Sequence, residues 1–118
     1  MKTFSQLKKL LLIINPVSGR RTSLRFLPDI IRIFSEGDYA VTVFPTGKSG
    51  DATQFAQLYG SEFDLIVCIG GDGTLNEVIT GIIRGECHTC LLYTSFYKLH
   101  YRVKARYRLF KARGVKRL

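Results

Sequence analysis

The sequence has 118 residues, of which 46% are hydrophobic, and it contains three prolines and three cysteines. This length allows one modest hydrophobic core and excludes two full domains, and three cysteines are too few for a disulfide scaffold. The formal net charge of +9 is confined to one part of the chain, because residues 1–83 hold eight basic and eight acidic residues, whereas residues 84–118 hold ten basic residues and one acidic residue.

The N-terminal segment carries three lysines before an apolar run at residues 10–14. That run has five residues and ends at Asn15-Pro16, so it is too short for a signal peptide and far below the roughly 18 residues of a membrane-spanning helix. We therefore interpret it as a buried strand. We expect a cytoplasmic protein, with peripheral contact to a membrane as the only membrane association that the sequence supports.

Residues 10–14 are continuously aliphatic, which is typical of a strand buried on both faces. After Ser23, a possible helix cap, apolar residues recur at helical spacing up to Phe34. Residues 39–44 are aromatic and β-branched and predict a second strand. The first half of the chain therefore predicts a strand, a helix and a strand.

The same alternation continues. A second helix starts at residues 49–51 and stops at Gly60, and residues 65–69 predict a third strand. A third helix begins near Thr74 and runs to about Arg84. The order β-α-β-α-β-α predicts an α/β fold with three layers and a mostly parallel sheet. Ligands of such sheets bind beyond the carboxyl ends of the strands, where the loops at residues 15–19, 45–50 and 70–74 converge.

The third of these loops carries the clearest chemical signal. Residues 70–74 are Gly-Gly-Asp-Gly-Thr, and three glycines let backbone N–H groups face outward without a Cβ in the way. The helix that follows adds its unpaired N–H groups and the positive end of its dipole. We predict that this turn binds phosphate. Asp72 would repel a bare phosphate, so it suggests a Mg²⁺ ion or a hydroxyl donor between them.

Two alternatives concern the same turn. Thr74 and Glu77 stand in the spacing of a capping box, in which each side chain would bond the other's backbone N–H. Two common phosphate motifs are excluded: Thr42 stands where a P-loop before Lys48 needs glycine, and Asn76 stands where the dinucleotide fingerprint needs glycine or alanine.

Three segments in order, Asn-Pro-Val-Ser-Gly at residues 15–19, Thr46 with Gly-Asp-Ala at 50–52, and Gly-Gly-Asp-Gly-Thr-Leu-Asn-Glu-Val at 70–78, resemble the diacylglycerol kinase and bacterial lipid kinase family. The resemblance covers about residues 8–84. It implies ATP and Mg²⁺ as cofactors and a diacylglycerol-like lipid hydroxyl as the acceptor. An NAD-kinase-like protein, which also has a Gly-Gly-Asp-Gly turn, is the alternative that residues 15–19 disfavour.

The resemblance also implies the site residues. It names no catalytic residue. Asp72 is the expected metal ligand because of its charge beside the expected phosphate, not because of the resemblance. The expected nucleotide-binding residues are Asn15, Thr46, Gly70, Gly71, Asp72, Gly73, Thr74, Leu75 and Asn76.

Members of this family continue into another strand, a further nucleotide loop and a β-sandwich that carries the catalytic aspartate. We expect these parts to be absent here, so residues 1–84 form the nucleotide-binding part and residues 85–118 an irregular basic tail. A chain truncated in this way is expected to be inactive alone.

The tail leaves several hypotheses open. Residues 87–90, with His100, could contribute to a zinc site. Alternating basic and apolar residues at 101–109 could form an edge strand, and residues 98–117 could bind nucleic acid or anionic lipid. A frameshift or a truncated gene would also explain the abrupt change in composition at residue 85.

Overall fold

A computed structural model describes residues 2–17 and 23–94 of the chain. The described part contains four strands and three α-helices, joined in places by short 3-10 turns. In chain order they are β1 (Lys8–Ile14), α1 (Leu27–Glu36), β2 (Tyr39–Pro45), α2 (Asp51–Tyr59), β3 (Leu65–Ile69), α3 (Asp72–Arg84) and β4 (Cys90–Thr94). The predicted α/β class and the order of the first six elements are confirmed.

Two helix starts differ from the prediction. Residues Ser23–Phe26 form a 3-10 turn, so α1 begins only at Leu27. Helix α3 begins at Asp72, two residues before Thr74, because glycine at position 71 already serves as its N-cap.

The strand β4 was not expected, and the prediction that this chain lacks the strand that follows the helix in family members is wrong. Residues 90–94 pair in parallel with β3, from Leu65 opposite Cys90 to Ile69 opposite Thr94. Residues 90–94 contain one β-branched residue, whereas β3 contains three, so their own preference for a strand is weaker and the pairing with β3 decides their conformation.

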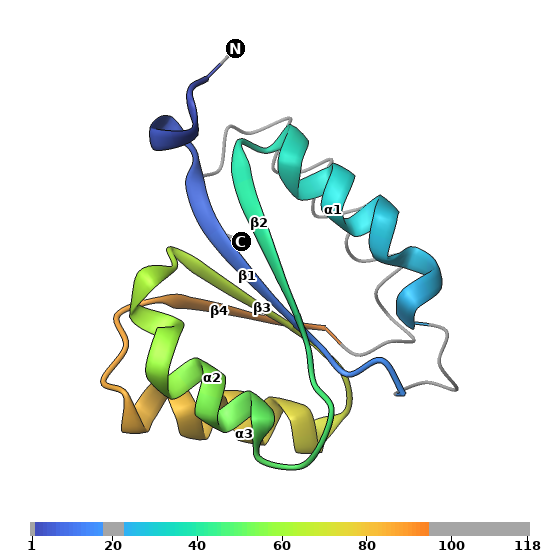
Figure 1. Ribbon diagram of the computed structural model, residues 1–118, viewed down its shortest axis with the longest axis vertical. Helices are drawn as coiled ribbons and strands as arrows, with labels where there is room; N and C mark the ends of the chain where they lie inside the picture. Colours follow the sequence, from blue (N-terminus) through green and yellow to red (C-terminus); the bar gives the residue numbers. More distant parts are fainter. Residues whose placement is uncertain (1, 18–22, 95–118) are drawn as a thin grey trace.

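The sheet has the strand order β2-β1-β3-β4, and all its strand pairs are parallel. Along the chain, β2 is added on one side of β1, and β3 is then added on the other side of β1. This change of side places α1 on one face of the sheet and α2 with α3 on the other (Figure 1). The carboxyl ends of β1 and β3, where ligands of such sheets bind, therefore lie side by side.

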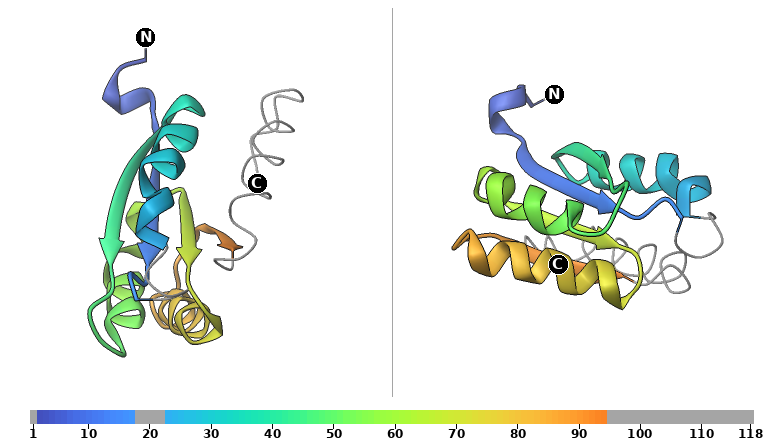
Figure 2. Two further views of the ribbon diagram at one scale, coloured as in Figure 1. Left: turned by 90° about the vertical axis from the view of Figure 1, so that its right-hand side faces the viewer. Right: turned by 60° about the horizontal axis from the view of Figure 1, so that its bottom comes forward.

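Helices cover both faces of the sheet (Figure 2). The core consists of two apolar layers, one on each face. Alternate residues of β1 and β3 point to opposite faces, and both faces are covered, so β3 is buried throughout and β1 is buried from Leu10 to Ile14. The layer under α1 contains Leu10, Leu12, Ile14, Ile30, Phe34, Tyr39, Leu65, Val67 and Ile69. The layer under α2 and α3 contains Leu11, Ile13, Ala52, Ala56, Ile66, Cys68 and Val78.

Helices α2 and α3 approach each other closely because two glycines of the α3 segment face the backbone of α2. A Cβ at Gly81 would lie 2.4 Å from the carbonyl oxygen of Thr53, and a Cβ at Gly85 would lie 2.6 Å from that of Gln57. Real Cβ atoms do not approach backbone this closely, so the pair cannot pack in this way with larger residues at these positions.

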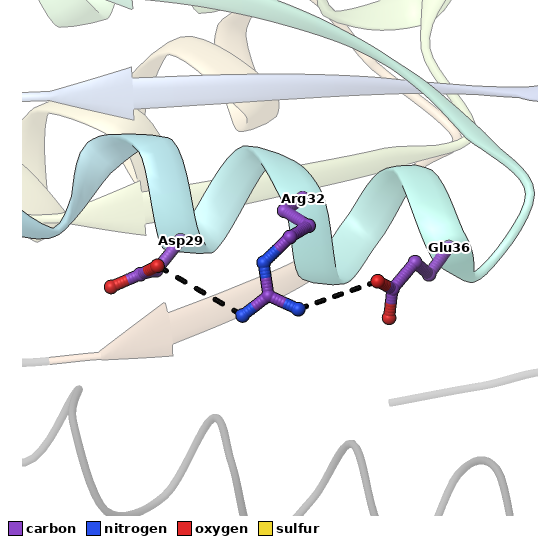
Figure 3. A network of polar contacts seen from close by, with 3 residues as sticks. All are labelled: Asp29, Arg32 and Glu36. Carbon is purple, nitrogen blue, oxygen red and sulfur yellow. Dashed lines mark hydrogen bonds and ion pairs between the residues drawn. The ribbon is translucent and has the colours of Figure 1, made fainter.

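The outer face of α1 is polar. Arg32 lies between Asp29 and Glu36, with nitrogen to oxygen distances of 3.9 and 3.3 Å (Figure 3). All three side chains are exposed, so solvent screens these ion pairs and they add little to stability. Among the described residues, no helix is long and apolar enough to cross a bilayer.

Candidate functional site

A pocket of about 410 Å³ opens at the carboxyl edge of the sheet. It is lined by the loops that follow β1, β2 and β3, as the sequence predicts for the described part of these loops. The lining residues are Asn15, Val17, Thr46, Gly47, Lys48, Ser49, Gly71, Gly73, Thr74 and Glu77. Ser18 and Gly19 lie outside the described residues.

The sheet ladder carries the first two loops to this edge. The Asn15 N–H donates to the carbonyl of Ile69 at 3.1 Å, and the Thr46 N–H donates to the carbonyl of Ile14 at 2.9 Å. The side-chain oxygen of Asn15 then accepts a hydrogen bond from the Val17 N–H at 3.1 Å, which turns the chain out of β1. Asn15 and Thr46 are therefore held by bonds that extend the strand pairing.

The three glycine positions of the turn are under different structural constraints. A Cβ at Gly70 would lie 2.8 Å from Oγ1 of Thr74, so this position is closed by packing. Gly71 and Gly73 have no other atom within 4 Å of such a Cβ, and neither has a positive φ. Neither the backbone conformation nor packing within the chain therefore requires glycine at 71 and 73. At Gly73, which lies within a helix, glycine even lowers stability by about 0.5–1 kcal/mol relative to alanine. Both positions leave bare backbone open to the approach of a ligand.

The N-terminus of α3 supplies donors at the same place. The first intrahelical bond of this end runs from the Leu75 N–H to the carbonyl of Gly71, at 3.1 Å. The N–H groups of residues 72–74 precede that bond and have no acceptor within the helix. A helix of 13 residues also presents the positive end of its dipole there. This end of α3 suits an anion.

Asp51, at the start of α2, shapes the loop after β2. Its Oδ2 accepts hydrogen bonds from the N–H groups of Gly47 and Lys48, at 2.8 and 2.9 Å. These two backbone bonds lower the pKa of the Asp51 carboxyl, with a further contribution from the charge of Lys48. Because both N–H groups are bound within the chain, the loop can offer a ligand its side chains at Thr46 and Lys48 rather than these amides.

Glu77 has a different role from the one that the capping-box spacing predicted. Its Oε1 accepts hydrogen bonds from the Gly50 N–H at 2.9 Å and from Oγ of Ser49 at 3.2 Å. The N-cap of α3 is Gly71, with no side-chain capping bond, and Thr74 is buried inside the first turn. The capping-box prediction is wrong because the helix starts earlier than the spacing implied.

The structure brings five of the nine predicted nucleotide-binding residues to the pocket: Asn15, Thr46, Gly71, Gly73 and Thr74. The other four do not line it. Gly70 is buried against Thr74, and Asp72 is the exposed first residue of α3. Leu75 packs against the core layer under α2 and α3, and Asn76 is exposed, its carbonyl accepting a bond from Oγ1 of Thr80 at 2.7 Å.

Sequence reasoning missed several lining residues, of which Lys48 and Glu77 are charged. The signal for Lys48 was present, because residues 45–50 were expected to reach the same edge as the glycine turn. Glu77 gave no such signal, since its contact with residues 49 and 50 depends on how α3 packs on α2.

The metal chemistry of the described residues is limited. They contain no group of three or more His, Cys, Asp or Glu side chains that could hold an ion. A Mg²⁺ ion that arrives with a nucleotide needs only one or two carboxylates, because phosphate oxygens and water complete its coordination, and exposed Asp72 fits that requirement. The zinc hypothesis gains no support from Cys87 and Cys90, and His100 lies outside the described residues.

Cys68 is fully buried in β3. Burial raises the pKa of its thiol to about 12. It is therefore a core residue with no part in the pocket.

Comparisons with known proteins point to one domain family. Residues 9–93 match the diacylglycerol kinase catalytic domain family. The chain is 43% identical over 76 residues to a diacylglycerol kinase of Staphylococcus epidermidis, a match that covers 64% of this chain and 24% of that protein. It is 39% identical over 77 residues to the diacylglycerol kinase of Bacillus subtilis, with 64% and 25% covered. The chain spans about a quarter of the length of these curated relatives.

Solved structures agree. The crystal structure of a diacylglycerol kinase from Bacillus anthracis is similar with a TM-score of 0.62 and 31% identity, over 79% of this chain and 31% of that one. A phosphate-loop protein with a TM-score of 0.54 and 18% identity shares the fold. The family match reaches residue 93 and so includes most of β4, beyond residue 84 where the resemblance was expected to end.

Proposed function

We propose, because the chain belongs to the diacylglycerol kinase catalytic domain family, that its pocket holds the phosphates of ATP in a lipid kinase. In the reaction proposed, the γ-phosphate of ATP passes to the hydroxyl of a diacylglycerol-like lipid. The observation that carries this proposal is the pair Gly71 and Gly73, whose Cβ positions face open space beside the pocket and the start of α3.

The pocket has the size and the donors that this ligand requires. Small-molecule sites commonly measure roughly 300–1,000 Å³, and this one measures about 410 Å³. The N–H groups of residues 72–74 would bind anionic oxygens, and Lys48 would offset part of their charge. Asn15 and Thr46 would line the remainder of the nucleotide site.

The residues present also fit Mg²⁺ bound to the nucleotide. Asp72 would provide its protein ligand, and the ion would supply neutralisation of the phosphate charge. Glu77, the carboxylate that lines the pocket, already accepts two hydrogen bonds from the loop, so we assign it no proton transfer. The proposal for this chain therefore concerns nucleotide binding, and we expect no phosphoryl transfer by the chain alone.

Titration calorimetry of the 118-residue protein with Mg²⁺ and ATP tests the proposal. Gly71→Val fills the open position with a side chain, so we expect its Kd to rise at least about tenfold while its thermal unfolding stays near that of the wild type. Ser61→Val is the matched control, because Ser61 is exposed and precedes β3, at the opposite edge of the sheet. Equal affinity of wild type and Gly71→Val, or no binding by the wild type, would contradict the proposal.

A further inference from the structure

Two carboxylates hold residues 46–50, the loop between β2 and α2, and they come from different helices. Asp51 belongs to α2 and binds the N–H groups of residues 47 and 48. Glu77 belongs to α3 and reaches across from 27 residues further along the chain to the N–H of Gly50. One contact is local, and the other joins this loop to the helix that begins at the glycine turn.

We infer that Glu77 is a positioning residue: it fixes the loop at residues 46–50 relative to the glycine turn, and so sets the distance between the two sides of the phosphate pocket. The expected effect of Glu77 on nucleotide affinity rests on the proposed function. The structural content of the inference, the contact between Glu77 and Gly50, stands on the geometry alone.

The chemistry of Glu77 argues against direct contact with phosphate. An ionised carboxylate is an acceptor without a donor, so it would repel anionic oxygens beside it. Its Oε1 instead receives both the Gly50 N–H and the Ser49 hydroxyl. A carboxylate can line a phosphate pocket when hydrogen-bond donors of the chain bind its oxygens. Here those donors belong to the loop at residues 46–50.

The backbone around the contact is already restricted. Gly50 has a φ of +93°, a left-handed conformation that L side chains rarely adopt. Oγ1 of Thr53 donates to the carbonyl of Glu77 at 2.9 Å, and Gly81 lets α3 lie against the backbone of α2 one turn further on. Helix α3 therefore has a fixed position relative to α2. The hydrogen bond from the Gly50 N–H to Glu77 fixes the loop relative to α3 as well.

Three substitutions of Glu77 separate the effect of side-chain length from the effect of side-chain charge. Glu77→Gln keeps the length and a side-chain oxygen that can accept the Gly50 N–H, whereas Glu77→Asp keeps the charge and is too short by one methylene. Glu77→Ala removes the acceptor, and alanine is a good helix former, so α3 is retained. Glu62→Ala is the control, because Glu62 is an exposed carboxylate of the turn before β3.

Two readouts apply to the full chain: amide hydrogen exchange at Gly50, measured by NMR without ligand, and the Kd for ATP with Mg²⁺. We expect Glu77→Ala and Glu77→Asp to exchange at least about tenfold faster at Gly50 and to bind at least about tenfold more weakly. Glu77→Gln and Glu62→Ala should stay within about threefold of the wild type in both.

The two failures are distinguishable. Unchanged exchange at Gly50 in Glu77→Ala would overturn the inference even if ATP binds. Weak binding by Glu77→Gln with normal exchange at Gly50 would also overturn it, because the charge would then act on the ligand directly. Absence of ATP binding by the wild type would contradict the proposed function, and the exchange measurement would still decide whether Glu77 holds the loop.

Discussion

The two helical layers of this protein are packed in different ways. Helix α1 contacts the sheet through large side chains, with Ile30, Ile33 and Phe34 buried. Helices α2 and α3 contact each other through small residues, and the buried residues of α2 are Ala52 and Ala56. The α1 layer can adjust by side-chain rotation, whereas in the α2–α3 layer backbone meets backbone. The pocket draws four residues from α3 or its N-cap and none from α1.

This difference suggests that close packing in the α2–α3 layer serves precision at the site, and that the α1 layer serves stability. A change of one carbon atom in each layer tests that interpretation. Of four substitutions, Gly81→Ala is expected to have the largest effect and Arg32→Ala the smallest.

Gly81→Ala adds one carbon between α2 and α3. Its Cβ would meet the carbonyl oxygen of Thr53 at 2.4 Å and Cβ of Ala56 at 2.8 Å, so α3 must shift. We expect a loss of about 1–3 kcal/mol, near the upper end because the first atom met belongs to the backbone, together with weaker ATP binding. Urea unfolding and calorimetry measure the two effects.

Gly73→Ala is the control in the same helix. A Cβ there has open space, so helix propensity alone predicts stabilisation by about 0.5–1 kcal/mol. If Gly81→Ala stabilised the protein in the same way, the close contact between α2 and α3 would not exist in solution.

Ile30→Val removes one carbon from the α1 layer. Ile30 is buried in the core layer under α1, and such a deletion costs about 0.5–1.5 kcal/mol. We expect the Kd for ATP with Mg²⁺ to remain that of the wild type, because no residue of α1 lines the pocket. Calorimetry at a temperature where the variant is folded measures this Kd. An altered Kd would contradict the separate roles of the two layers.

Arg32→Ala removes the centre of the ion-pair network on the outer face of α1. Both of its partners are exposed, so we expect the free energy of unfolding to change by less than about 0.5 kcal/mol. Unfolding at low and high salt checks this value. A larger loss would mean that α1 depends on its solvent face as well as on its buried one.

The sequence predicted most of the fold because strands and helices of this length carry their own periodic patterns. The runs at residues 10–14 and 65–69 gave the two central strands, and the spacing in 75–83 gave α3. It missed β4, whose five residues form a strand only beside β3. Loop convergence predicted the place of the pocket. Five of the nine predicted residues line it, and the sequence could not separate these from the other four.

Residues near the turn show why. Leu75 and Asn76 belong to the motif that suggested phosphate binding, yet helical geometry turns Leu75 into the core and leaves Asn76 exposed. Glu77 was expected to cap its own helix and contacts Gly50 instead. Contacts between residues far apart in sequence depend on how two helices pack, and a linear motif does not contain that information.

The position of β1 between β2 and β3 has a consequence for synthesis on the ribosome. This strand leaves the ribosome first, and its pairing with β2 needs only the chain up to Pro45. Its other edge stays unpaired until β3, ending at Ile69, has also emerged. The nascent chain therefore exposes an apolar strand edge, and the three loops of the pocket meet only when that edge is closed.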